Sequence, residues 1–183
     1  MEKIVIAVSG PPGAGSTSVA RLLAKRMRLK FFSPGLVQKK MSKEKSQTKA
    51  AIETWGTELV RSKKFHENMD KVQIEKAEKG NIVICGKLSI HFLKELADFR
   101  IWLDVPLKVR ARRTAERDRI SIKEAEMSIA RREEMERGSW KRIYGFDYLE
   151  QKKDADLVIN SSRLTQQQTV NKIISFINSR YEK

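Results

Sequence analysis

The chain has 183 residues, enough for one domain with a substantial core and too few for two full domains. It carries 38 Lys and Arg against 23 Asp and Glu, and the resulting net charge of +15 favours an anionic partner such as a nucleotide, a nucleic acid or a membrane surface. Its single cysteine, Cys85, excludes an internal disulfide and a metal site made of several cysteines, and is typical of a reducing compartment. Charged residues interrupt every apolar run before the roughly 18 residues that a membrane span needs, so we expect a cytoplasmic protein without membrane contact.

Short apolar runs bounded by turn residues predict buried β-strands. The first run, KIVIAV, is rich in β-branched residues and predicts a central strand buried on both faces. The predicted strands, in chain order, are Lys3–Val8, Leu29–Ser33, Asn81–Gly86, Phe99–Pro106 and Ala155–Asn160. Helical stretches separate them, and this alternation indicates a parallel sheet with helices on both faces.

The helical stretches differ in character. After the first strand, apolar residues follow at helical spacing, namely Val19, Leu22, Leu23 and Met27. The region from about Leu36 to Lys79 is polar and lysine-rich, so we expect its helices to stand partly clear of the core. Two later helices have the capping-box spacing at their starts, Ser121–Glu124 and Thr165–Gln168.

The segment GPPGAGSTS connects the first strand to the first helix and resembles the phosphate-binding pattern G-x-x-x-x-G-K-[ST]. Gly10 and Gly15 match the glycines and Thr17 the hydroxyl position, but Ser16 stands where the pattern has lysine. Such loops hold phosphate oxygens with backbone N–H groups and a helix N-terminus, and the hydroxyl binds magnesium. The predicted phosphate site consists of Gly10, Pro11, Pro12, Gly13, Ala14, Gly15, Ser16, Thr17 and Ser18, with Thr17 as the metal ligand.

The absent lysine removes a positive charge from a place where phosphoryl transfer depends on charge. Two groups of arginines are available to replace it: Arg110, Arg113 and Arg117, and further along Arg131, Arg132 and Arg137. The planar fork of arginine suits phosphate oxygens. The same arginines alternate with glutamates and would equally suit solvated helix faces, so spacing alone leaves both interpretations open.

Aromatic and histidine residues give weaker signals. Trp102 lies inside a predicted strand, which places it in the core. Trp55 and Trp140 lie in polar helical regions, where each would either stack on a base or anchor a mobile element, and we favour anchoring. His66 and His91 lack the sequence neighbours expected of a metal site or a catalytic triad.

Several segments, in order and over nearly the whole chain, resemble the archaeal-type cytidylate kinases: SGPPGAG, SPG, GNIVICGKL, RIWLDVPLKVRARR, RREEMERGSWKRIYG and DLVINSSRLT. In that family the loop lysine is often replaced by Thr or Ser, as at Ser16. The resemblance implies the α/β fold of the P-loop nucleotide kinases, with a five-stranded parallel sheet flanked by helices. It implies one kinase domain over residues 1–183, with a helical monophosphate-binding arm at about 36–79 and a short lid at about 121–147.

The resemblance also implies roles for individual residues. The loop would hold the phosphates of ATP with Mg²⁺, and Arg131 and Arg132 would be the catalytic arginines of the lid. The acceptor site would consist of Ser33, Gly35, Lys39, Gly86 and Lys87. Tyr144, Gly145 and Asp147 match the family's Y-G-x-D.

The chain departs from the family mainly on the acceptor side. Val37-Gln38-Lys39-Lys40 stands where the family usually has an arginine, and Lys39 is the candidate replacement. Cys85-Gly86-Lys87 stands where the family has an acidic residue, glycine and arginine. A small residue that ends a buried strand favours packing as the role of Cys85.

The leading hypothesis is a kinase that moves the γ-phosphoryl group of ATP, with Mg²⁺, to a pyrimidine monophosphate, most readily CMP or dCMP. One alternative, from another class, is a nucleotide-binding protein with little or no kinase activity that acts through an RNA or a protein partner. A further alternative keeps the kinase and changes the acceptor to AMP, UMP or a non-nucleotide alcohol. We expect a monomer whose partners are its nucleotide substrates.

Overall fold

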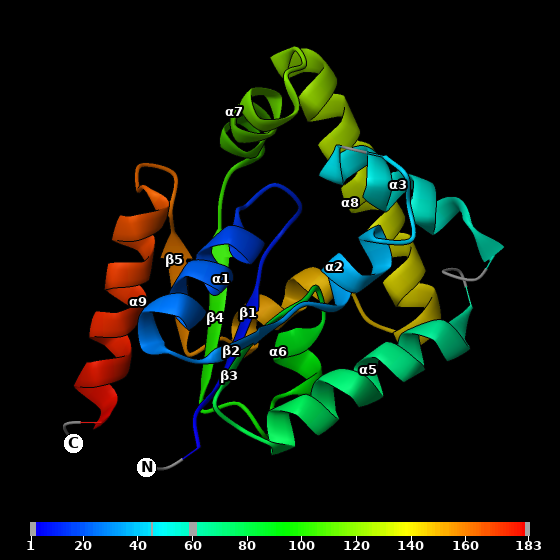
Figure 1. Ribbon diagram of the computed structural model, residues 1–183. Helices are drawn as coiled ribbons and strands as arrows, with labels where there is room; N and C mark the ends of the chain where they lie inside the picture. The colour runs from blue at the N-terminus through cyan, green and yellow to red at the C-terminus, as the bar shows by residue number, and fades with distance from the viewer. Residues whose placement is uncertain (1–2, 45, 59–61, 182–183) are drawn as a thin grey trace.

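The computed structural model describes residues 3–44, 46–58 and 62–181, and its strands form one parallel sheet (Figure 1). The strands are β1 (Val5–Ser9), β2 (Lys30–Phe32), β3 (Ile82–Cys85), β4 (Phe99–Asp104) and β5 (Leu157–Asn160). Their order in the sheet is β2-β3-β1-β4-β5, and every neighbouring pair is parallel. The prediction of a five-stranded parallel sheet with the first strand at its centre is confirmed.

Helices connect the strands and cover both faces of the sheet (Figure 1). They are α1 (Ser16–Met27), α2 (Pro34–Lys39), α3 (Gln47–Gly56), α5 (Lys63–Glu78), α6 (Ser89–Phe92), α7 (Leu107–Asp118), α8 (Ile122–Tyr144), the 3-10 helix η1 (Tyr148–Asp154) and α9 (Gln166–Tyr181). Within the described ranges, none of them combines the length and the apolar character that crossing a membrane requires.

Both predicted helix starts are confirmed. The hydroxyl of Ser121 accepts a hydrogen bond from the backbone N–H of Glu124 at 3.1 Å. At the start of α9 the box is reciprocal, because the Thr165 hydroxyl accepts from the Gln168 N–H while the Gln168 side-chain oxygen accepts from the Thr165 N–H. Each bond satisfies a backbone donor that the first helical turn leaves without a partner.

The two faces of the sheet have separate cores because successive strand residues point to opposite sides. On one face, Ile6 and Val8 of β1 pack with residues of α1 and α9. On the other face, Val5 and Ala7 belong to a cluster with residues of α5, α6 and α8, and with Trp102, which is in the core as predicted. The covered sheet therefore fixes the positions of its strand ends, where the candidate site lies.

The lysine-rich region differs from our expectation that its helices stand partly clear of the core. Helix α3 packs along α8, and α5 contacts β3 and α6 (Figure 1). The junction is an aromatic cluster of Trp55, His66 and Trp140, whose rings lie 4.5–5.0 Å apart between centroids. All three residues are buried, and they supply the apolar contact that the polar composition of the region had not indicated.

Candidate active site

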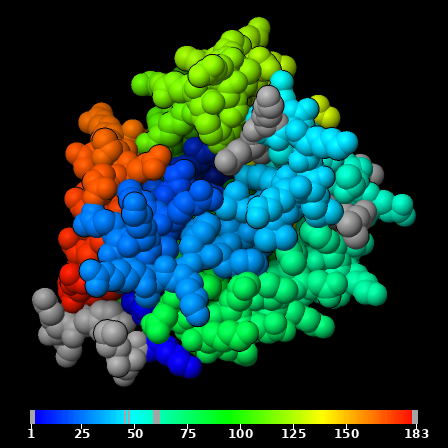
Figure 2. All heavy atoms as spheres, in the orientation of Figure 1, coloured from blue at the N-terminus to red at the C-terminus, as the bar shows by residue number. Residues whose placement is uncertain are grey.

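A cleft of about 680 Å³ opens where the strands β1 and β3 end. The loop Gly10–Ser18 and the start of α1 line it, together with residues of α2, α7, α8 and the segment that joins β5 to α9. Figure 2 shows the hollow, with the dark-blue loop recessed between the yellow-green α7 region and the orange segment after β5. All nine residues of the predicted phosphate site line this cleft.

Two glycines, Gly10 and Gly13, allow the loop to pack closely against β4, α7 and α8. Gly13 has a φ of +79°, and a Cβ atom there would lie 3.1 Å from side-chain atoms of both Arg110 and Ile129. At Gly10 a Cβ atom would lie 2.8 Å from the backbone oxygen of Leu103 on β4. A side chain at either position would displace the loop, so these glycines are required by close packing as well as by backbone conformation.

Arg110, from the first arginine group, holds the loop from behind. Its side chain is 6% exposed and donates hydrogen bonds of 2.9 Å to the backbone oxygens of Pro12 and Val105. Glu133 of α8 pairs with the same guanidinium at 2.8 Å. Its donors are thus directed at the protein, and its role is to support the loop.

Arg113 and Arg117 lie at the cleft itself. Arg113 donates to the backbone oxygen of Ala14 in the loop at 3.3 Å and also contacts Ser161 after β5. Arg117 donates to the Thr48 hydroxyl of α3 at 3.0 Å and pairs with its neighbour Asp118. The first arginine group therefore divides into one supporting residue and two that line the cleft.

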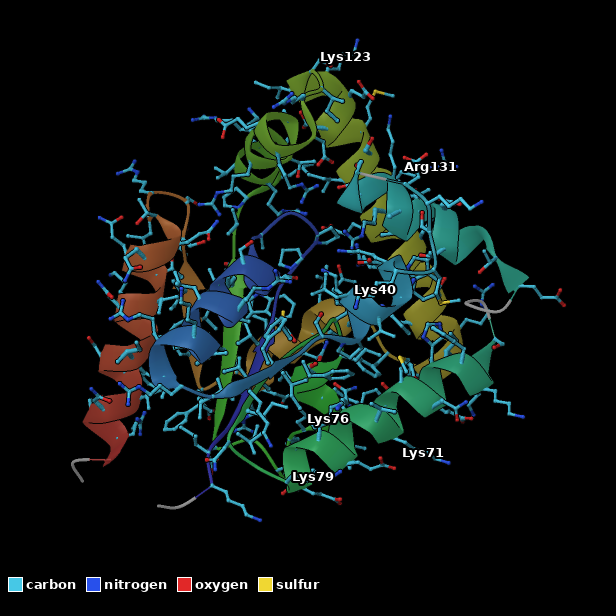
Figure 3. All side chains as sticks on the ribbon, in the orientation of Figure 1. Lys40, Lys71, Lys76, Lys79, Lys123 and Arg131 are labelled. Carbon is cyan, nitrogen blue, oxygen red and sulfur yellow. The ribbon has the colours of Figure 1, made fainter. Side chains whose placement is uncertain are left out.

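The two predicted lid arginines fall on different sides of α8, because successive helical residues are about 100° apart. Arg132 lines the cleft, and its Nε donates to Glu136 at 2.7 Å. Arg131 is exposed and lines a separate groove between α3 and the start of α8 (Figure 3). Arg137 pairs with Asp147 at 2.5 Å. The structure brings Arg132 to the predicted site and does not bring Arg131 there.

The five predicted acceptor residues, Ser33, Gly35, Lys39, Gly86 and Lys87, all line the same cleft. A second pocket of about 60 Å³ adjoins it between α2, α3, α5 and α8, and shares Gly35, Lys39, Gly86, Lys87 and Arg132 with the main cleft. Trp55, His66 and Trp140 line this second pocket. The loop and the predicted acceptor residues thus come together from distant parts of the chain.

The sequence analysis missed a polar pair in the second pocket. The Asp70 carboxylate accepts hydrogen bonds from the Tyr144 hydroxyl and, at 2.9 Å, from the Gln73 amide. Burial raises the pKa of Asp70 to about 6, although both hydrogen bonds oppose the change. The available signal was an acid and an amide three residues apart on a helix that is otherwise rich in lysine.

The comparisons with known proteins identify the family. The profile of the cytidylate kinase-like family matches residues 5–163. The chain belongs to this family. It is 39% identical over 162 residues to the cytidylate kinase of Pyrococcus horikoshii, which covers 88% of this chain and 82% of that protein. It is 36% identical over 180 residues to the cytidylate kinase of Pyrococcus abyssi, covering 98% of this chain and 97% of the relative.

Solved structures of lower identity share the fold of this cytidylate kinase-like protein. The shikimate kinase of Bacteroides thetaiotaomicron has a TM-score of 0.62 at 17% identity, covering 97% of this chain and 99% of that one. The shikimate kinase of Acinetobacter baumannii, in complex with shikimate, has a TM-score of 0.58 at 15% identity, and the match covers 99% of this chain and 96% of that one. The predicted P-loop kinase fold is therefore confirmed.

Two lysines of the cytidylate kinase-like site are held in an unfavourable environment. Burial lowers the pKa of Lys39 to about 7, and the charges of Arg132 and Lys87 add to the effect. Burial also lowers the pKa of Lys87 to about 8, with Glu136 opposing the change. Positive charge is concentrated here, and binding an anion would favour both ammonium groups.

This environment predicts a pH dependence of stability to which Lys39 contributes. Between about pH 7 and pH 9 the unfolded chain keeps a proton on Lys39 that the folded chain has lost, so the free energy of unfolding rises with pH. Lys39→Met removes this contribution, and we expect a flatter rise than in the unchanged protein. Urea unfolding at several pH values in this range measures it.

The neighbouring residue provides the control. Lys40 is exposed (Figure 3), so Lys40→Met should retain the slope of the unchanged protein. Cys85, Lys87 and the other titrating groups are common to all three proteins and largely cancel in the comparison. Equal slopes for Lys39→Met and the unchanged protein would show that Lys39 is not buried among positive charges.

The surroundings of Thr17 bear on a magnesium site. Burial raises the pKa of the Cys85 thiol, against smaller opposing effects from hydrogen bonds to Ser16 and Thr17. Cys85 is 3% exposed and belongs to the core cluster, as expected of a packing residue. Mg²⁺ prefers oxygen ligands, and the described residues contain no group of three His, Cys, Asp or Glu arranged for a metal. The hydroxyl of Thr17, which lines the cleft, is an oxygen donor of the kind that Mg²⁺ prefers.

Proposed function

We propose that this protein is a cytidylate kinase that transfers the γ-phosphoryl group of ATP to CMP or dCMP. The observation that carries the proposal is that one cleft is lined by the phosphate loop, by the acceptor residues around Lys39 and by Arg132. The relatives named cytidylate kinase, which match almost the full length of the chain, support the same acceptor.

On the donor side, the loop from Gly10 to Ser18 would hold the phosphates of ATP. Gly15 is the N-cap of α1, so the backbone N–H groups of the loop and the positive end of the helix are directed at the same place. Thr17 would hold Mg²⁺ together with the phosphates, and the ion supplies charge neutralisation during transfer. Arg113 lies close enough to the loop to bind an outer phosphate oxygen or the nucleoside.

On the acceptor side, Lys39 would bind the phosphate of CMP. The adjoining pocket offers a carboxylate at Asp70 and an amide at Gln73. Cytosine has an amino donor next to a ring-nitrogen acceptor, so a carboxylate and an amide donor match its edge. This chemistry supports a pyrimidine that carries an amino group over uracil.

The transfer step needs little chemistry from the protein. An oxygen of the CMP phosphate forms the new bond to the γ-phosphorus while the bond to the oxygen of ADP breaks. Because the attacking oxygen is already ionised, the step requires no general base. Arg132, at the junction of the two pockets, would stabilise the charge that spreads over the transferred group.

A panel of acceptors tests the proposal. With ATP and Mg²⁺, we expect kcat/KM for CMP or dCMP to exceed that for UMP, AMP and shikimate by about tenfold or more, because a mismatched polar edge leaves buried groups unpaired. A coupled assay for ADP measures turnover. ATP binding without turnover of any acceptor would favour the nucleotide-binding alternative, and preference for another acceptor would refute the assignment to CMP.

A further inference from the structure

The structure places an ammonium group, from the turn that follows β3, beside the loop that lacks its lysine. Lys87 Nζ donates a hydrogen bond of 2.6 Å to the backbone oxygen of Gly10, the first residue of the phosphate loop. Lys87, Gly10 and Ser16 all line the main cleft. A positive charge that is absent from position 16 is thus present in the same cleft, in contact with the start of the loop.

The sheet register determines this position. Strands β1 and β3 are parallel neighbours in which Val8 pairs with Cys85. The Ser9 hydroxyl donates to the backbone oxygen of Gly86 at 2.6 Å, which continues the contact beyond the paired strands. One residue further along each of the two segments, Lys87 contacts Gly10. The backbone oxygen of Lys87 is itself fixed by the Gln151 amide at 2.7 Å, so the lysine projects from a constrained segment.

The partners of Lys87 leave it able to bind phosphate. An ammonium has three N–H donors. One is directed at Gly10, and the Glu136 carboxylate lies 3.8 Å away, beyond hydrogen-bonding distance. Glu136 is 2% exposed and is bound more closely by Arg132, at 2.7 Å. One carboxylate therefore serves as counter-ion to two cations and keeps them together without neutralising both.

We propose that Lys87 provides the donor phosphates with the positive charge that a lysine at position 16 provides in loops of the usual sequence. The proposal rests on the proposed kinase function and reassigns Lys87, for which the family resemblance implied a role on the acceptor side. Lys39, which belongs to α2, stays on the acceptor side. The two lysines, whose positive charges are close enough to interact, then bind the phosphates of different substrates.

Relocating the ammonium group tests the proposal. Lys87→Met should lower kcat by about 100-fold and weaken ATP binding by about tenfold, while the affinity for CMP changes by no more than about twofold. Adding Ser16→Lys to Lys87→Met should recover about tenfold or more of the lost kcat, because it returns an ammonium to the loop. Rescue of both kcat and ATP affinity is the expected result.

The controls separate the alternatives. Lys39→Met should weaken CMP binding and should gain nothing from Ser16→Lys. Lys71→Met, which removes an exposed charge on α5 (Figure 3), should change each constant by no more than about twofold. Loss of CMP affinity in Lys87→Met with ATP affinity intact, or a folded double variant without rescue, would overturn the proposal.

Direct binding measurements keep the test independent of two possible failures. If the double variant does not fold, judged by circular dichroism and thermal unfolding, the ATP and CMP affinities of Lys87→Met alone decide between the donor and acceptor sides. If the unchanged protein shows no turnover of CMP, the proposed function fails. In that case the effects of Lys87→Met and Ser16→Lys on calorimetric ATP binding still test the role of Lys87.

Discussion

Replacing Arg132 by alanine is expected to lower kcat by about 10²- to 10³-fold and to weaken ATP binding much less. Arg132 lines both the loop cleft and the adjoining pocket, so its guanidinium lies where the transferred group would pass. A charge that interacts mainly with the transition state affects the rate of transfer more than ground-state binding. Steady-state kinetics and calorimetric titration with ATP measure the two effects separately.

The adjacent arginine is the matched control. Arg131→Ala removes the same side chain from the same helix, but from the exposed groove next to α3, and should change kcat by no more than about twofold. Arg132→Ala also leaves the buried Glu136 without its closest partner, so thermal unfolding must confirm that the variant is folded. Arg132→Lys retains the charge without the planar fork, so its kcat should lie between those of Arg131→Ala and Arg132→Ala. Equal losses in Arg131→Ala and Arg132→Ala would contradict the assignment.

The distinction between these arginines illustrates what the sequence could not provide. The resemblance to the family marked Arg131 and Arg132 together, because adjacent residues share one motif. Only the rotation of α8 about its axis separates them, and that rotation is set by buried residues such as Ile129 and Trp140. The apolar pattern of a lysine- and arginine-rich helix was too weak to determine its orientation from the sequence.

Local patterns predicted the sheet, and the loop between β1 and α1, well. The β-branched runs have few ways to bury themselves except in a covered parallel sheet, and the loop lies between a strand and a helix that were both clear in the sequence. The contact of Lys87 with Gly10 was not predictable in this way, because it depends on which strands become neighbours and in what register. The shared ion pairing of Glu136 likewise requires α8 to be placed beside the turn after β3.

The lysine-rich arm was misjudged for a related reason. Its overall polarity suggested helices partly clear of the core, yet Trp55 on α3, His66 on α5 and Trp140 on α8 pack together. Each lies in a stretch rich in charged residues, so the apolar periodicity around it was weak. A cluster formed by one residue from each of three helices becomes visible only when the helices are packed.

Replacing Trp140 by alanine is expected to lower the free energy of unfolding by about 3–5 kcal/mol, the usual cost of removing a large buried aromatic side chain. Trp140 is 7% exposed and contacts Trp55, His66 and Tyr144. Its removal would leave a cavity and would remove the contact between α8 and the helices α3 and α5. Urea unfolding followed by circular dichroism measures the loss. Trp140→Phe should lose much less, because the indole N–H has no hydrogen-bond partner among the described residues and phenylalanine retains most of the ring contact.

The same variants decide between anchoring and base contact for this tryptophan. If Trp140 anchors α8 to the arm, Trp140→Phe should retain both stability and CMP affinity, and the CMP affinity of Trp140→Ala should fall in step with its stability. If Trp140 instead stacks on the base, Trp140→Ala should leave the free energy of unfolding nearly unchanged. Its free energy of CMP binding should then weaken by about 1–3 kcal/mol. Because Trp140 packs against the rings of Trp55, His66 and Tyr144, we expect the anchoring pattern. The stability of the arm and the shape of the second pocket would then depend on the same buried cluster.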